Sequence, residues 1–255
     1  MGITGQITDR LLSLVFPPVC LACREVEGCL ALDLGLCSRC HRALRPLGKS
    51  VCRTCGRPIA TPRLPDSYAC GPCRKSPPPF DWLLSGWSYE PPFDRVVHAL
   101  KFGRLIYLGD HLARHLAERF AAELVGCEMV APVPLHWSRQ LSRGYNQAEE
   151  IARPLARRLG LPLGRCLRRR RPTPPQTRFD RARRMANLRG AFRARGQARL
   201  RGKAVLLVDD VVTTGATLSA AAACLKRGGA RQVVALTAGW TPVGGDAPRR
   251  VGELG

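Results

Sequence analysis

Eight cysteines in four Cys-x-x-Cys pairs constrain the amino-terminal part of this chain more than any other sequence feature. The gaps between successive pairs are 13, 11 and 14 residues. A Cys-x-x-Cys turn directs two thiolates at one point, and two such turns form a closed tetrahedral site that suits Zn²⁺. We therefore predict two structural zinc ions, because a segment this short buries little apolar surface of its own. The predicted ligands are Cys20, Cys23, Cys37, Cys40, Cys52, Cys55, Cys70 and Cys73.

The simplest arrangement places the first two pairs on one ion and the last two on a second ion. An interleaved arrangement, with the first pair joined to the third, is also compatible with the spacing. A disulfide framework is the alternative chemistry, but it requires an oxidising compartment, and a thioredoxin-like motif would explain one pair only. Cys29 is left without a role, and Cys127, Cys166 and Cys224 are expected to be small core residues.

The start of the chain does not have the pattern of a secretory signal. Residues 11–16 are mostly apolar, but Asp9 and Arg10 precede them and Pro17-Pro18 follow, without a small-residue cleavage site. The apolar spacing over residues 1–16 favours a short amphipathic helix. No stretch of 18 uninterrupted apolar residues occurs, so we predict a cytoplasmic protein without membrane insertion.

The charge balance indicates an anionic partner or substrate. The chain holds 41 Lys and Arg against 19 Asp and Glu, a net charge of +22. A charge of this size is typical of proteins that meet a polyanion, although solvated surface arginines are the simpler alternative. Arginine runs at 168–171 and 181–184 make single-stranded DNA a candidate partner. The aromatic side chains available for base stacking are few: Trp87, Tyr89, Trp137 and Tyr145.

The remainder of the chain, after Pro77-Pro78-Pro79, alternates between strand and helix patterns. Because strands that alternate with helices favour a mostly parallel sheet with helices on both faces, the predicted fold class is α/β. The expected strands are 82–89, 129–131, 204–208 and 233–238, and the expected helices are 93–104, 105–124, 147–159 and 216–227.

Residues 204–218, with the sequence AVLLVDDVVTTGATL, carry the clearest chemistry. An apolar strand leads to two adjacent acids, a short Thr/Gly loop and a helix, and parallel sheets bind ligands at that edge. The backbone N–H groups and threonine hydroxyls of the loop can hold a phosphate. The paired acids can hold vicinal ribose hydroxyls, or a hydrated Mg²⁺ that in turn holds pyrophosphate. Helix capping alone does not require two carboxylates side by side.

This segment resembles the phosphoribosyl pyrophosphate signature of type I phosphoribosyltransferases. Over residues 17–240 the chain resembles the ComF (ComFC) family, in which a zinc ribbon, often double, precedes a phosphoribosyltransferase domain; some members serve in natural competence. Residues 100–102 (LKF), 132–134 (PVP) and 143–147 (RGYNQ) also match, as do Gln176, Arg184, Asn187 and Phe192. The resemblance implies a double zinc ribbon (17–76) and a phosphoribosyltransferase domain (80–240). The apolar spacing predicts a helix before them (1–16), and the Gly- and Pro-rich composition predicts a flexible tail after them (241–255).

The resemblance also implies roles for individual residues. The acids would hold the ribose 2′ and 3′ hydroxyls, residues 213–217 would wrap the 5′-phosphate, and residues 132–134 would form a pyrophosphate loop with a strained peptide bond. Residues 168–187 would form a mobile loop over the site. The residues expected to bind phosphoribosyl pyrophosphate with Mg²⁺ are Asp209, Asp210, Val211, Thr213, Thr214, Gly215, Ala216, Thr217, Pro132, Val133 and Pro134. The candidate catalytic residues are Lys101, Arg143 and Arg184.

Two classes of function follow from these features. The first is transfer of the phosphoribosyl group to a nitrogen acceptor, for which the sequence identifies neither the acceptor nor a general base. The second is a non-catalytic competence factor that binds single-stranded DNA, and other competence proteins, and uses the phosphoribosyl site as a ligand sensor. A zinc-ribbon transcription factor with a degenerate enzyme domain is disfavoured because the signature is intact.

Overall fold

The computed structural model describes residues 19–25, 33–48, 50–59, 61, 65, 67–170 and 190–242. Several sequence predictions fall outside these residues. They concern the helix over residues 1–16, the tail beyond residue 242, Cys29, and the loop residues Gln176, Arg184 and Asn187.

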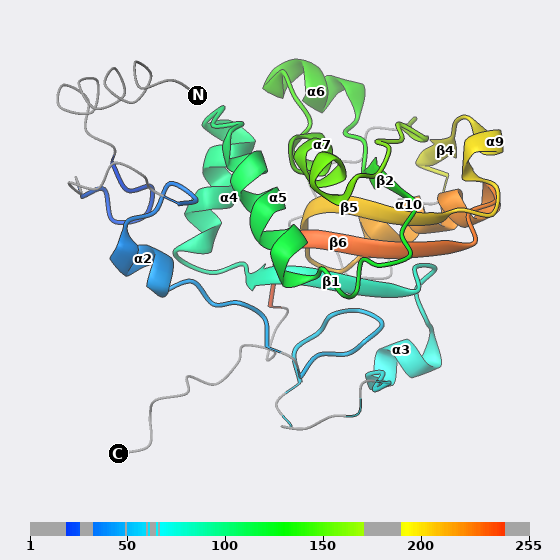
Figure 1. Cartoon of the computed structure of the whole chain (residues 1–255), viewed down its shortest axis with the longest axis horizontal. Coiled ribbons are helices and arrows are strands. Elements are labelled where there is room, and N and C mark those ends of the chain that lie inside the picture. The colour runs from blue at the N-terminus through cyan, green and yellow to red at the C-terminus, as the bar shows by residue number, and fades with distance from the viewer. Residues whose placement is uncertain are drawn as a thin grey trace.

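A four-stranded parallel sheet with the strand order β1-β6-β5-β2 forms the centre of the molecule (Figure 1). Residues 204–208 of β5 and 233–240 of β6, the two central strands, are buried, which explains the apolar sequences of these segments. A separate antiparallel pair, β3 and β4, lies beyond the edge strand β2. The strands are β1 (Trp82–Ser88), β2 (Met129–Pro132), β3 (Leu167–Arg169), β4 (Phe192–Ala194), β5 (Ala204–Val212) and β6 (Gln232–Trp240).

Helices cover both faces of this sheet, as predicted. The helix α7 illustrates why the ends fall where the sequence places them. Asn146 caps its first turn by accepting a hydrogen bond from the N–H of Ala148, and Gly160 ends it at a φ of 65°. The helices are α2 (Ser38–Arg42), α3 (Gly71–Lys75), α4 (Phe93–Phe102), α5 (Leu108–Arg119), α6 (Trp137–Arg143), α7 (Gln147–Leu159), α9 (Gln197–Leu200) and α10 (Ala216–Arg227).

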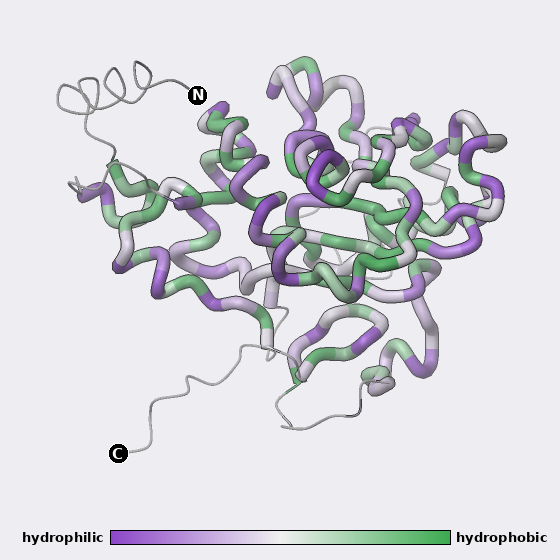
Figure 2. The backbone as a smooth tube through the Cα atoms, in the orientation of Figure 1, coloured by the Kyte–Doolittle hydropathy of each residue, from purple (hydrophilic) through white to green (hydrophobic). Residues whose placement is uncertain are grey.

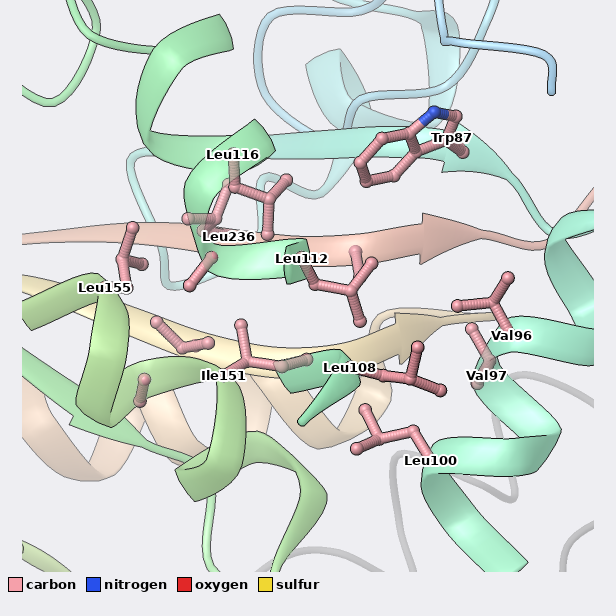
Figure 3. Close-up of a cluster of buried hydrophobic side chains, with 14 of the residues drawn as sticks. Trp87, Val96, Val97, Leu100, Leu108, Leu112, Leu116, Ile151, Leu155 and Leu236 are labelled. Atoms are coloured by element: carbon pink, nitrogen blue, oxygen red, sulfur yellow. The ribbon is translucent and has the colours of Figure 1, made fainter. Parts of the chain in front are cut away.

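Alternate residues of the central strands supply two apolar layers. Leu206 and Val208 face the layer covered by α4, α5 and α7, whereas Val205 and Leu207 face the layer covered by α10. Figure 3 shows the first layer, where leucines of α5 pack beside Ile151 and Leu155 of α7 and above β6. In Figure 2 the hydrophobic colouring is concentrated along the sheet.

The helices α5 and α7 approach each other closely at Gly109. A Cβ atom at this position would overlap the backbone carbonyl oxygen of Glu150 in α7. The absence of a side chain at Gly109 therefore allows the two helices to form one continuous cover over the sheet.

Some expected element boundaries were wrong. β5 continues to Val212, because its backbone keeps pairing with β6 beyond Asp209, so the paired acids lie within the strand instead of after it. The helix expected over residues 105–124 is limited to α5, since Arg104 adopts a φ of 55° and a turn occupies residues 120–126. The helix α6 and the β3–β4 pair were not predicted.

The two cysteine-rich halves differ in how they join the core. Cys20, Leu34, Leu36 and Cys37 belong to the same buried cluster as the helices α4, α5 and α7. Cys52, Cys70 and Cys73 form a cluster of their own, with Ile59 and Tyr68 against it. The first half is thus continuous with the main core, whereas the second half has a buried cluster of its own.

Candidate functional site

The paired acids of β5 meet a lysine from another element. The Nζ atom of Lys101, in the last turn of α4, lies 2.9 Å from Oδ2 of Asp210. The same ammonium group lies 5.9 Å from the centre of the Tyr89 ring. Two sequence features that are more than 100 residues apart, LKF and the paired acids, therefore meet at the carboxyl edge of the sheet.

Burial changes the acid–base properties of this cluster. Burial, together with the adjacent charge of Asp210, raises the pKa of Asp209 to about 8. Burial alone would lower the pKa of Lys101, but the nearby Asp210 carboxylate outweighs it and raises that pKa. At neutral pH the site therefore holds a protonated or partly protonated carboxyl beside an ion pair.

The loop between β5 and α10 has the form of a phosphate site. Gly215 adopts a φ of 73° at the N-cap of α10, where no side chain caps the first backbone N–H groups. Thr213 is exposed, and Thr214 and Thr217 are partly exposed beside it. Free N–H groups and hydroxyls at the positive end of a 12-residue helix can hold a phosphate monoester.

Three side chains of the RGYNQ motif (residues 143–147) form hydrogen bonds with backbone carbonyls at this edge of the sheet. The Tyr145 hydroxyl donates to the carbonyl of Leu100, and Gln147 Nε2 donates to the carbonyl of Lys101 at 3.5 Å. Asn146 Nδ2 donates to the carbonyl of Val133 at 3.0 Å. The motif thus fixes the end of α4, which carries Lys101, relative to the loop that contains Val133.

The expected strain in the loop Pro132-Val133-Pro134 is not found. The only cis peptide bond among the described residues is Pro91–Pro92, so the peptide bonds of the 132–134 loop are trans. The carbonyl of Val133 accepts the Asn146 side chain, and its N–H pairs with the carbonyl of Val208. Hydrogen bonding on both sides holds this loop in an ordinary conformation.

Of the other predicted catalytic residues, the described part of the structure includes Arg143. The guanidinium carbon of Arg143, at the end of α6, lies 4.7 Å from the centre of the Phe102 ring, one residue beyond Lys101. Arg184 lies outside the described residues. The structure therefore joins Lys101 to the acids and places Arg143 beside the end of α4.

The eight paired cysteines form two separate tetrads in sequential order. The sulfur atoms of each tetrad lie within 4.8 Å of one another, so the interleaved alternative does not apply. Cys23 and Cys37 are 3.8 Å apart and Cys55 and Cys70 are 3.7 Å apart between their Sγ atoms. Zinc–sulfur bonds of about 2.3 Å place tetrahedral sulfurs about 3.8 Å apart, so both tetrads fit zinc.

Backbone donors favour the thiolate form of one sulfur in each tetrad. The N–H of Cys37 donates to Cys20 Sγ at 3.3 Å, and the N–H of Cys70 donates to Cys52 Sγ at 3.2 Å. Burial opposes ionisation, but these bonds and others lower the pKa of Cys20 to about 6 and that of Cys52 to about 7. All cysteines among the described residues are free of disulfides.

Comparison with known proteins matches both parts of the chain. A family model described as a double zinc ribbon domain matches residues 11–77, and one described as a phosphoribosyl transferase domain matches residues 146–240. "DNA utilization protein YhgH" of Salmonella typhimurium is 38% identical over 86% of this chain and 96% of its own length. The Escherichia coli K12 protein of that name is 35% identical over the same shares, and "Competence protein F" of Haemophilus influenzae is 33% identical over 78% of this chain and 87% of its own.

The chain belongs to the ComF family. The family assignment and the two tetrads together support structural zinc in a double zinc ribbon. None of the helices in the described part of this ComF-family chain is both long enough and apolar enough to cross a membrane.

An arginine groove, which the sequence predicted only in part, lies beside the site of this ComF-family protein. It consists of two adjoining hollows of about 570 and 560 Å³ that share Trp137, Arg168, Arg169 and Arg195. One hollow reaches Pro132, Pro134 and Asn146, and the other follows the β3–β4 pair. The run at 168–171 is apparent in the sequence, whereas Arg193 and Arg195 are not, because isolated arginines form no motif. The arginines of the groove are Arg165, Arg168, Arg169, Arg170, Arg193 and Arg195.

Proposed function

We propose that this protein binds phosphoribosyl pyrophosphate together with Mg²⁺ and transfers the phosphoribosyl group to a nitrogen acceptor. One observation carries the proposal: a partly buried acid pair in β5, contacted by Lys101, lies just before an uncapped helix N-terminus with Gly215 in the left-handed conformation. In this arrangement the acids accept hydrogen bonds from the ribose hydroxyls, and residues 213–217 hold the 5′-phosphate.

The residues fit a magnesium ion that arrives with the pyrophosphate. One oxygen of Asp210 is occupied by Lys101, and the pKa of Asp209 is raised, so the acids do not offer two free carboxylates to a bare ion. Mg²⁺ keeps several waters and binds substrate phosphates with one or two carboxylates. When bound, it neutralises charge on the pyrophosphate, and Asp209 or Asp210 can accept hydrogen bonds from its waters.

The chemical step is a substitution at the anomeric carbon. The lone pair of the acceptor nitrogen forms the new N–C bond, the C–O bond to pyrophosphate breaks, and its electrons leave with pyrophosphate. The nitrogen then loses a proton to the surrounding water or to a base on the acceptor. Lys101 and Arg143 are proposed to stabilise the charge that develops on the leaving group, as is Arg184 from the predicted mobile loop.

Ligand binding by matched variants tests this proposal. The double variant D209N/D210N keeps the size of both side chains but removes the charge of Asp210 and the titratable carboxyl of Asp209, and we expect calorimetry with phosphoribosyl pyrophosphate and Mg²⁺ to show at least a tenfold loss of affinity. The exposed Glu123→Gln is the control and should bind as the unmodified protein does. Release of pyrophosphate across a panel of nucleobases and amines would then identify the acceptor, and unchanged affinity in D209N/D210N would refute the site.

Single-stranded DNA is a second candidate ligand, favoured by the arginine groove. The groove combines six arginines with Trp137, whose side chain is 64% exposed, and so pairs phosphate contacts with a stacking surface. The relatives named for DNA utilization and competence support the same proposal. In this alternative function, the phosphoribosyl site lies next to the groove at residues 132–134 and acts as a ligand sensor. Ligand bound there controls the binding of DNA and of competence-machinery partners.

The salt dependence of DNA affinity tests the groove. R193S/R195S removes two arginines from the groove, whereas R95S/R157S removes two exposed arginines outside it, with the same change in net charge. We expect the first variant to lower the slope of log affinity against log salt by about 1.4, and the second to leave it unchanged. Equal effects of both variants would indicate general charge attraction.

Thiolate zinc ligands need a reducing compartment, so cytoplasmic localisation forms part of the proposal.

A further inference from the structure

A cluster of histidines surrounds one carboxylate where the first zinc ribbon meets α5. Asp33 lies in the turn before Cys37, and His41 directly follows the zinc ligand Cys40. His111 and His115 are one helical turn apart in α5, so both face the ribbon. Three of the five histidines in the chain therefore gather around Asp33, although they come from two elements that are about 70 residues apart.

The two oxygens of Asp33 have different surroundings. Oδ2 faces two imidazole nitrogens, His115 Nε2 at 2.6 Å and His41 Nε2 at 3.3 Å. Oδ1 is held by Arg114 at 2.8 Å and lies 3.0 Å from His111 Nδ1. Oδ1 is thus fixed by neighbouring donors, whereas Oδ2 forms a hydrogen bond with His115 Nε2 and lies beside His41 Nε2 without a hydrogen bond to it.

The donor set matches the chemistry of a transition-metal site. The carboxylate oxygen and the two Nε2 atoms all lie within 4.8 Å of one another. The Nε2 atom of His41 is buried, and its 3.3 Å approach to Asp33 does not have the geometry of a hydrogen bond, so this nitrogen has no hydrogen-bond partner among the described residues. An unsatisfied buried nitrogen is costly unless something coordinates it. Two imidazoles and one carboxylate suit zinc, with a further position open to water.

We propose that Asp33, His41 and His115 bind a third divalent transition-metal ion, with zinc the expected one, in addition to the ions of the two cysteine tetrads. Arg114 and His111 orient the carboxylate from its other oxygen, as outer partners of metal ligands commonly do. The side chains of Asp33, His41 and His115 are 31%, 37% and 22% exposed, so the cluster lies near the surface of the molecule. The ion would join the first ribbon to the helix that covers the sheet.

Metal content of the full chain, with any affinity tag removed, tests this inference. After loading with zinc and removal of loosely bound ions, we expect three zinc ions per chain for the unmodified protein and two for His115→Ala. The exposed His98→Ala should keep three, since it lies outside the cluster. Asp33→Asn, which keeps the shape of the side chain, should also give two and guards against a folding defect in His115→Ala. Two zinc ions in the unmodified protein, or three in both cluster variants, would overturn the proposal.

Cobalt distinguishes the third ion from the thiolate sites. Co²⁺ added to protein with both tetrads filled by zinc should give visible bands without thiolate-to-cobalt charge transfer, because the ligands are nitrogen and oxygen. His111→Ala should weaken this cobalt binding by about 10- to 100-fold without abolishing it. Charge-transfer bands in every variant would show that cobalt only replaces zinc at the cysteines, and would refute a separate site.

Discussion

Lys101 and Asp210 form an ion pair 2.9 Å long that joins the last turn of α4 to the central strand β5. Asp209, the next residue along the strand, has a pKa raised to about 8 by burial and by the charge of Asp210. Adjacent carboxyl groups of one strand therefore differ: one is paired with a cation and the other retains its proton more readily. The positive charge of Lys101 therefore offsets negative charge on the carboxylates of this site.

Removal of that cation should weaken binding of an anionic ligand. For Lys101→Met we expect the affinity for phosphoribosyl pyrophosphate and Mg²⁺ to fall by about 10- to 100-fold, as for the loss of a charged hydrogen bond. The pKa of Asp209 should rise further, because Lys101 lowers it at present. Calorimetry and carboxyl NMR titration measure the two effects. Lys101→Arg is the control that keeps the charge; recovery of affinity there separates loss of charge from loss of packing.

The raised pKa of Asp209 should make stability fall as the pH increases. Above the ordinary carboxyl pKa the unfolded chain has lost this proton, whereas the folded chain keeps it up to about pH 8. The folded state thus binds more protons, and the free energy of unfolding decreases between those two values, by at most about 1.4 kcal/mol per pH unit. Denaturant unfolding of the zinc-loaded protein between pH 6 and 8.5 measures this slope. Asp209→Asn should flatten it, and an identical slope in that variant would assign the effect to other groups.

Asn146 should contribute to stability in two separable ways. Its Oδ1 caps α7 at Ala148, and its Nδ2 holds the carbonyl of Val133. We expect Asn146→Ala to lower the free energy of unfolding by about 2 to 3 kcal/mol. Asn146→Ser keeps a capping oxygen but cannot reach Val133, so it should lose about half as much. Chemical denaturation compares the three proteins; equal losses in both variants would mean that the cap contributes little.

The two zinc ribbons should differ in their effect on the whole protein. Cys20 and Cys37 lie in the main core cluster, whereas Cys52 and Cys70 lie in a separate one. Cys23→Ser and Cys55→Ser each remove one partly exposed ligand and should each cost one zinc ion per chain. We expect the first variant to lower the melting temperature of the sheet domain more than the second. Equal shifts, measured by calorimetry with zinc content determined in parallel, would contradict the difference in core attachment.

The sequence predicted the sheet because local signals and tertiary packing agree there. The apolar run at 204–208 and the glycines after residue 227 define β5 and α10, and the boundaries of α7 and α10 were confirmed. The extension of β5 to Val212 was missed, since aspartates are uncommon in strands. Here the hydrogen bonds of β6 maintain the strand past Asp209.

The site was predictable where a compact motif carries it and not where single residues converge. The cysteine tetrads and the segment 204–218 each occupy one stretch of chain. The Lys101–Asp210 pair, the three hydrogen bonds of RGYNQ and the arginine groove depend on contacts between distant elements. Arg193 and Arg195 become significant only when the β3–β4 pairing places Arg193 opposite Arg168 and brings Arg195, just after β4, to the same hollow.

The strand order has a consequence for how the chain folds as it is synthesised. The edge strands β1 and β2 pair with β6 and β5, which are the last two strands of the sequence. While the ribosome is still making the middle of the chain, both edge strands lack the neighbours that satisfy their backbone groups. The cysteine tetrads are complete by residue 73 and can take up metal long before that point. Metal uptake by the amino-terminal tetrads can therefore precede completion of the sheet, which requires residues up to 240 to have emerged.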